Sequence, residues 1–255
     1  MPAARTAASG GLLATILATG VSVRHAVSRA LATANLSPGE ATWQVLTARA
    51  QVDGSGRVVR ADVTLRIRRP EVLEHLPLAE RVGWVNPDGQ HPLMALVPVP
   101  DPAGLRFVLL DVLPVTWDGW MACRQDAALP DDADPFCPFL EASWDEARAF
   151  ARQREARLPS VDELRAAWGP AAYPWGARPD THLGLEGRPR FDVCPAVGLH
   201  PPGSFGHFDL GAWLWHLTDS GRLFGGAAGQ EGPPEAVAPE PGLWPVGFRC
   251  AVDVP

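Results

Sequence analysis

The chain has 255 residues, of which 46% are hydrophobic and 20% charged, the composition of a folded globular protein rather than a disordered one. Its net charge of -7 argues against nucleic-acid binding, which needs a concentrated basic surface. Since no run of 18 apolar residues occurs, we expect no membrane span. All 22 basic residues are arginine, which indicates a GC-rich, bacterial genome.

A possible signal peptide and the pattern of cysteines indicate in which cellular compartment the protein lies. The apolar stretch from Leu12 to Val23 has one arginine upstream of it and in this respect resembles a weak signal peptide. It lacks a clear small-residue cleavage site and continues with Arg24, so the sequence favours the cytoplasm over secretion. Cys123 and Cys137 could form a disulfide in an oxidising compartment or remain buried free thiols, and the sequence leaves both open. No Cys-x-x-Cys pair indicates a zinc knuckle.

The first third of the chain reads as a helix followed by a hairpin. Apolar residues from Gly11 to Leu36 recur at helical spacing, so we expect one amphipathic helix, which Gly20 could interrupt. Two strands follow, at about 43–52 and 61–67, joined by a turn at 53–56. In the second strand Ala61, Val63, Leu65 and Ile67 alternate with polar residues, which predicts one buried face.

Shorter elements complete this region. Pro70–Val82 could hold a helix, Asn86–Gly89 reads as a turn, and strands are expected at 93–99 and 105–113 with a turn at 100–104. The pattern predicts a small α+β region over residues 1–104, whose function the sequence does not indicate.

Two helices in the second region carry strong start signals. Ser143 with Glu146, and Ser160 with Glu163, form capping boxes, in which the serine and the glutamate satisfy each other's backbone amides. Trp144, Ala147 and Phe150 share a face of the first helix, and Leu164 and Trp168 share a face of the second.

The stretch from Pro195 to Asp219 is unusual because it is irregular and apolar together. Its Pro and Gly content excludes a single helix or strand. It nevertheless carries enough apolar mass to form a core: Phe205, Phe208, Leu210, Trp213, Leu214 and Trp215. We therefore expect a buried, ordered loop whose polar backbone groups find partners in neighbouring loops, with Trp215 almost fully buried.

Several short blocks, in order, resemble the formylglycine-generating-enzyme/sulfatase-modifying-factor family. They are Pro114-Val115-Thr116, Ser143-Trp144-Asp145-Glu146-Ala147, Arg157-Leu158-Pro159, Tyr173-Pro174-Trp175-Gly176, Phe208-Asp209-Leu210, Gly225-Gly226 and Gly247-Phe248-Arg249-Cys250. The resemblance implies an α+β fold over residues 105–255: a C-type-lectin-like domain with two helices, short antiparallel strands and much ordered loop.

The resemblance also implies metal sites that this chain does not match. The family holds copper with two cysteines between its "GGS" and "GFRC" blocks, and the corresponding interval here, 227–245, contains no cysteine. Thiolates suit Cu(I) because both are soft. At the family's calcium site, Trp213 and His216 stand where Asn and Glu would supply oxygen ligands. We expect no cofactor, no metal ligand and no catalytic residue.

Candidate binding residues are aromatic or imidazole side chains that replace or extend the family positions. These tentative ligand-binding residues are Trp117, Trp120, Trp213, His216 and Trp244. Trp144, Trp168, Trp175 and Trp215 lie in family blocks and are expected to be packing residues. A zinc site from His182, His200, His207 and His216 is the weaker alternative to histidines that bond locally, since their spacing matches no known ligand pattern.

Three functions remain open. The first is a non-catalytic module that binds an unknown protein or small-molecule ligand on a formylglycine-generating-enzyme-like scaffold. The second is an oxidoreductase of the formylglycine-generating type with a rebuilt metal site, although the missing cysteine pair leans against an enzyme. The third is a retroelement-diversified variable binding protein, a class rich in Asn and Tyr before its "GFR", where this chain has neither.

Overall fold

The fold was analysed in a computed structural model of the whole chain. The structure describes residues 12–21, 23–36, 42–52, 58–68, 85–86, 94–123, 133–135, 137–140, 142–177, 197–198, 202–203, 205–211, 213–226, 235–236 and 245–254. The expected turn at 53–56 and the expected helix at 70–82 lie outside these residues, as does the expected turn at 86–89 except for Asn86, which ends a short strand.

The expected single helix from Gly11 to Leu36 is wrong in its first half. Residues Leu12–Gly20 form strand β1, and only Val23–Thr33 form helix α1. β1 pairs antiparallel with β3 and turns Ile16 and Ala18 toward the core while Leu17 points outward. A Cβ on Gly20 would collide with the backbone of His25 and Ala26, so the glycine permits the tight passage from strand to helix.

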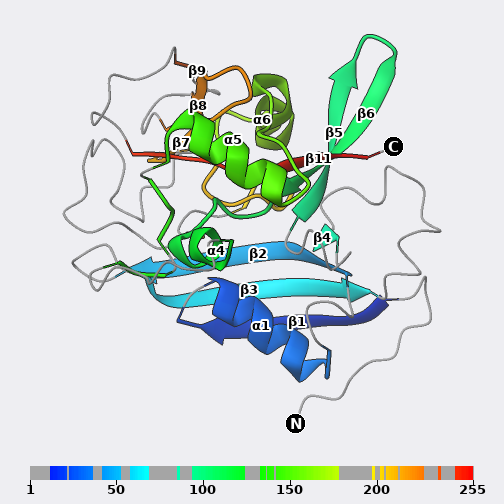
Figure 1. Cartoon of the computed structure of the whole chain (residues 1–255). Coiled ribbons are helices and arrows are strands. Elements are labelled where there is room, and N and C mark those ends of the chain that lie inside the picture. The colour runs from blue at the N-terminus through cyan, green and yellow to red at the C-terminus, as the bar shows by residue number, and fades with distance from the viewer. Residues whose placement is uncertain are drawn as a thin grey trace.

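The expected hairpin is confirmed. β2 (Thr42–Val52) and β3 (Val58–Arg68) pair antiparallel over nearly their whole length. Val63, Leu65 and Ile67 are fully buried while the intervening residues are half-buried, which is the alternation the sequence predicts. α1 packs against β1 and β3, as Figure 1 shows in the lower half of the molecule.

One seven-stranded sheet runs through both halves of the chain. Its order is β1-β3-β2-β4-β5-β6-β11, with β4 at Val85–Asn86, β5 at Met94–Asp101, β6 at Gly104–Asp111 and β11 at Ala251–Asp253. The two strands expected at 93–99 and 105–113 are thus confirmed as an antiparallel hairpin. The division expected between residues 104 and 105 falls inside that hairpin.

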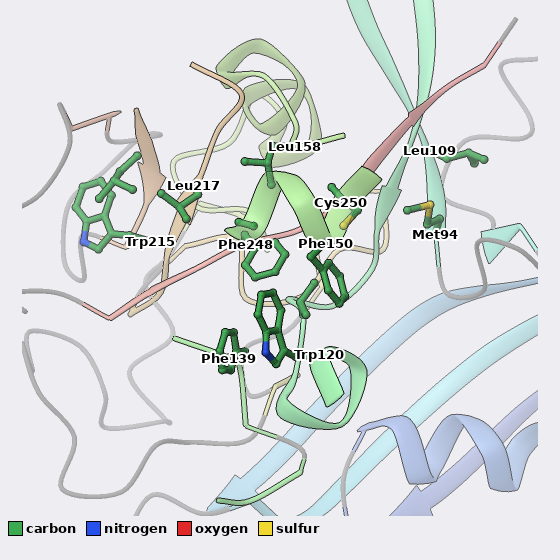
Figure 2. Packing of buried hydrophobic residues seen from close by; sticks show 14 of the residues in the cluster. Met94, Leu109, Trp120, Phe139, Phe150, Leu158, Trp215, Leu217, Phe248 and Cys250 are labelled. Atoms are coloured by element: carbon green, nitrogen blue, oxygen red, sulfur yellow. The ribbon is translucent and has the colours of Figure 1, made fainter. Parts of the chain in front are cut away.

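The β5–β6 hairpin separates two apolar cores. Met94, Leu96 and Leu109 face the cluster that contains α4 and α5, while Val97 and Val108 face the cluster that contains α6. Cross-strand partners share a face, as in the pairs Leu96–Leu109 and Val97–Val108. Figure 2 shows the first cluster, where aromatic rings from distant parts of the chain meet.

Three helices cover this part of the sheet. α5 (Trp144–Gln153) and α6 (Val161–Trp168) begin where the capping boxes predict, and both boxes are complete. α4 (Trp117–Ala122) was not expected from the sequence. Its cap, Thr116, accepts a hydrogen bond from the Gly119 amide at 3.2 Å. Each of these helices begins at a side chain that accepts a hydrogen bond from one of its first free amides.

A second, smaller sheet holds the C-terminal strands in the order β10-β7-β8-β9. Their ranges are Trp215–Leu217 (β7), Leu223–Gly225 (β8), Glu235–Ala236 (β9) and Val246–Gly247 (β10). β7 pairs antiparallel with β8 but parallel with β10, which corrects the expectation of antiparallel strands alone. The chain between β8 and β10 is long enough to return in the same direction, as a parallel pair requires.

The fold is a mixed α and β arrangement of mainly antiparallel sheets with few helices. In the part of the chain that the structure describes, none of the helices has the length and hydropathy needed to cross a membrane.

Candidate binding site and its buried polar support

The structure describes four of the five candidate binding residues and does not bring them together in one exposed site. Trp120 is buried in the α4–α5 cluster, stacked on Phe139 at 4.3 Å between ring centroids. Trp213 is buried in the cluster beside α1, and His216 lies in a polar core, so neither occupies the exposed loop position expected for a binding surface. Trp117 is half-buried, and Trp244 lies outside the described residues. Ligand binding by these residues stays a prediction.

Within the stretch from Pro195 to Asp219, residues 206–211 and 213–218 are buried as the sequence predicts, and Trp215 is 6% exposed. The side chain of Arg249 connects this segment to the end of β6. Its guanidinium is 0% exposed and donates to the backbone carbonyls of Asp111 (3.0 Å), Val112 (2.9 Å) and Phe208. Two carbonyls at the end of β6 and one in the irregular segment therefore share one donor group, which fixes the segment relative to the end of β6.

Asp111 is the anionic counterpart at the end of β6. Its carboxylate accepts two hydrogen bonds from Arg154, at 3.0 and 3.1 Å, and one from the amide of Cys250 at 2.7 Å. Such a bidentate arginine–carboxylate pair is directional as well as charged. The pair joins the end of α5 to the sheet next to the last strand.

Two buried histidines near Arg249 bond to backbone carbonyls. His207 Nε2 donates to the carbonyl of Leu110 at 3.2 Å, and His216 Nε2 donates to the carbonyl of Asp209 at 2.9 Å. Asp209 has a positive φ of 54° and accepts from the amide of Gly198 through its side chain. Short polar side chains tolerate this backbone region because they bond locally.

Burial and charge shift the pKa values of these groups in a consistent direction. Burial, with the nearby Arg249 charge, lowers the pKa of His207 to about 3 and that of His216 well below its ordinary value. Burial also lowers the pKa of Arg249 to about 10, against the opposing effect of Asp209 and Asp111. At neutral pH the histidines are therefore neutral and the arginine is charged.

The cysteines of the described chain are thiols suited to packing. Cys123, Cys137 and Cys250 are thiols, so the possible disulfide between Cys123 and Cys137 is not formed. Burial, and next the Asp111 charge, raise the pKa of Cys250 well above its ordinary value. Cys250 therefore remains protonated, whereas a copper ligand or nucleophile must be a thiolate.

The residues at the implied metal positions do not fit a metal. His216 uses Nε2 to donate a hydrogen bond, and Trp213 is packed among apolar residues, so neither offers the oxygen that calcium prefers. Most of the interval 227–245 lies outside the described residues. Within the residues that are described, no group of three or more His, Cys, Asp and Glu side chains is placed to hold a metal ion.

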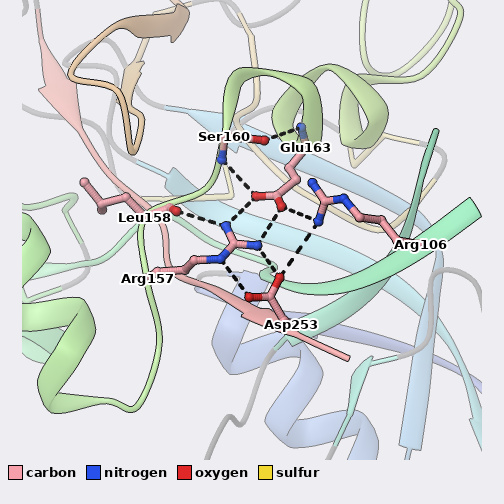
Figure 3. Close-up of polar contacts among 6 residues, drawn as sticks. All are labelled: Arg106, Arg157, Leu158, Ser160, Glu163 and Asp253. Carbon is pink, nitrogen blue, oxygen red and sulfur yellow. Dashed lines mark hydrogen bonds and ion pairs between the residues drawn. The ribbon is translucent and has the colours of Figure 1, made fainter. Parts of the chain in front are cut away.

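A four-residue ionic network lies at the start of α6 (Figure 3). Glu163 accepts from Arg157 at 2.7 and 2.8 Å and pairs with Arg106 at 2.7 Å, and Arg157 also binds Asp253. Although burial alone would raise it, the pKa of Glu163 is lowered by hydrogen bonds from Arg157, from the Ser160 amide and from Arg106. The network joins α6, β6 and β11.

The half-buried Trp117 occupies the start of α4. Its ring meets Phe139 edge-on, with 4.6 Å between centroids, and its amide donates to the carbonyl of Cys137 at 3.0 Å. The next amide, of Asp118, donates to the carbonyl of Pro135 at 3.1 Å. The tryptophan is thus fixed by both its ring and its backbone while part of it remains accessible.

Sequence reasoning did not single out Asp111 or Arg249. A signal was present for Arg249, which lies between Phe248 and Cys250 in an apolar block, where a lone charge must find buried partners. No comparable signal marks Asp111, because its partners lie 43 and 139 residues away in the sequence.

No protein-family model matches the chain. Among solved structures, the chain is similar to the Major Tropism Determinant I1 variant, with 15% identity and a TM-score of 0.39 over 64% of this chain and 53% of that one. Similarity to the M1 variant covers 80% of this chain and 60% of that one, with 12% identity and a TM-score of 0.40. The chain thus spans little more than half of the structures it matches. A likeness at these TM-scores carries no conclusion about function.

Proposed function

We propose that the chain is a non-catalytic binding module on a C-type-lectin-like scaffold. The observation that carries the proposal is the bonding of Arg249, whose guanidinium donates to three backbone carbonyls. Because the buried Asp111, His207 and His216 likewise bond to backbone or to Arg154, the polar centre serves to hold irregular chain rigid. Rigid loops reduce the entropy lost on binding a ligand.

The residue best placed to contact a ligand is Trp117. It combines a partly accessible aromatic ring with backbone and ring contacts that hold it in place. Tryptophans of this kind are frequent anchors in protein interfaces. The exposed Asp118 beside it adds an acidic group on the same helix.

The test is a binding screen of the full chain on immobilised peptides and glycans, followed by titration of each hit. We expect Trp117→Ala to raise the dissociation constant of a true ligand by at least about tenfold, which is the effect of losing an interface anchor. Trp144→Ala is the matched control, because Trp144 is also half-buried but contacts Arg148 and Thr218 elsewhere on the surface. Equal losses in both variants, or no hit at all, would contradict the proposal.

A second assay separates the binding module from the enzyme alternative. Reduced protein is titrated with Cu(I) against a competing chelator, and cysteine oxidation is measured in a sulfatase-type peptide. Stoichiometric copper with turnover would favour the oxidoreductase, since Cu(I) prefers thiolate ligands. The retroelement-diversified protein is a special case of the binding module, and variation among gene copies concentrated before Gly247-Phe248-Arg249 would support it.

A further inference from the structure

Strand β1 forms one end of the seven-stranded sheet. Its sequence, Leu12–Gly20, contains neither a charged residue nor a proline. Edge strands in natural proteins are usually short or carry charges or prolines that prevent pairing with another chain. β1 has nine residues and shows neither device within its length.

The outward face of β1 is apolar at its centre. Leu17 is 72% exposed and lies opposite Thr64 of β3, between Thr15 and Thr19 on the same face. Val21, just beyond the strand, is 61% exposed. Among the described residues the one other large apolar side chain of this kind is Leu105, at the tip of the β5–β6 hairpin. Two of these three residues therefore lie at the free end of the sheet.

We propose that β1 pairs antiparallel with β1 of a second copy of the chain, in a register centred on Leu17. This register places Leu17 opposite Leu17 of the partner subunit and Thr15 opposite Thr19 of the partner subunit. Apolar pairs and Thr–Thr pairs directly opposite each other stabilise antiparallel strands. The arrangement has two-fold symmetry, as self-complementary interfaces do.

Charge favours a second copy as the occupant of this edge. Because β1 is uncharged, pairing with itself brings no like charges opposite each other. The arginines of β3, such as Arg66, lie one strand further back. Across the pair they would be at least about 14 Å apart, which is three strand spacings and exceeds the Debye length in physiological salt. Arg29 donates to the Thr19 carbonyl at 2.7 Å. Because this carbonyl is already bonded, we expect the pairing between the two copies of β1 to end at Thr19.

The core-facing side supports the same register. Ile16 and Ala18 pack against the cluster that contains α1, and the register sets Ile16 opposite Ala18 of the partner subunit. A large side chain would thus face a small one at each step. The dimer is expected to be weak, because one strand pair buries less than the roughly 1,200 Å² of a standard interface.

The first test is sedimentation velocity of the full chain over a roughly hundredfold range of concentration, since association depends on concentration. We expect a monomer–dimer equilibrium. Leu17→Lys should lower the association constant at least about tenfold, because it sets two lysines opposite each other. Leu105→Lys is the matched control, since Leu105 is 65% exposed but lies far along the chain from β1. A strict monomer, or a dimer that Leu17→Lys leaves intact, would overturn the proposal.

The second test addresses the register. Under mild oxidation, Leu17→Cys should give a disulfide-linked dimer, whereas Thr15→Cys should not, because two residues 15 would be about 13 Å apart along the strands. Wild-type protein controls for the native thiols. Cross-linking of Thr15→Cys but not Leu17→Cys would refute this register. Slow amide hydrogen exchange throughout β1 in a strict monomer would instead show that another part of the chain covers the edge.

Discussion

At the scale of single residues, Arg249 has the largest expected effect on stability. Replacing it with methionine keeps much of the volume but removes the Arg249 donor from the carbonyls of Asp111, Val112 and Phe208, of which that of Val112 retains a second donor, the Phe208 amide. Removing one member of a buried charged arrangement costs about 3–5 kcal/mol. We expect a loss of that size in the free energy of unfolding measured by urea denaturation.

The control for this substitution is Arg165→Met. Arg165 pairs with Asp162 on the exposed side of α6, where an ion pair contributes about 0–1 kcal/mol. If both variants lost the same free energy, the role assigned to the buried guanidinium would be wrong.

Gly226 is the second decisive position at this scale. Its φ is 77°, and a Cβ there would lie 2.6 Å from ring atom Cδ2 of Trp215. Gly226→Ala combines a strained backbone with a collision against a buried ring, so we expect the protein to lose at least about 2 kcal/mol of stability.

Gly119→Ala is the matched glycine substitution. Gly119 lies inside α4, and an added Cβ would meet only Thr116 Oγ1, at 3.5 Å. Alanine favours helix over glycine by up to about 1 kcal/mol, so this variant should be neutral or more stable. Thermal denaturation of the two variants distinguishes them, and an equal loss in both would show that the Trp215 contact is not the cause.

At the scale of elements, the two capping boxes allow a matched comparison. Glu163 and Glu146 occupy the same position in their helices, but Glu163 is buried and bound by two arginines whereas Glu146 is exposed. Glutamine retains the shape and one acceptor but removes the charge. We expect Glu163→Gln to lower the free energy of unfolding by about 3 kcal/mol and Glu146→Gln to lower it by less than about 1 kcal/mol, as measured by urea denaturation. Similar costs would mean that the ionic network adds nothing to the cap.

The elements also show what the sequence can and cannot predict. Capping boxes and strand alternation are local signals, and α5, α6 and the β2–β3 hairpin occur where those signals lie. β1 was expected as helix because apolar residues at 12, 13, 16 and 17 fit a helical face. Its pairing with β3, some 50 residues later, decides in favour of a strand.

The candidate site was harder to predict than the fold. The irregular segment around Trp213 was recognised as buried in general, yet Trp213 itself was placed on a binding surface. Its burial depends on packing with α1 and β3, which no local pattern encodes. Likewise, α4 is only six residues long, too short for a periodic signal, and its aromatic contacts with Phe139 and Phe150 come from separate segments.

At the scale of the whole molecule, the two buried histidines should make stability depend on pH. His207 has an ordinary pKa of 6.5 in the unfolded chain and about 3 in the folded one, and the pKa of His216 is lowered in the same direction. Below pH 6.5 the unfolded state therefore binds protons that the folded state does not. The stabilisation is fully present above that pH and is lost as the pH falls.

Below pH 6.5 the free energy of unfolding should fall by about 1.4 kcal/mol for each histidine with every pH unit of acidification. The carboxylates of Glu163 and Asp253, whose pKa values are lowered on folding, add their loss only below their ordinary values of 4.5 and 3.8. Unfolding free energies measured between pH 6.5 and 4.5 thus isolate the histidines. His216→Gln keeps a donor for the Asp209 carbonyl and removes one titration, so the slope should fall by about half. A free energy of unfolding that does not change with pH in the wild type would show that the two imidazoles are not buried as neutral groups.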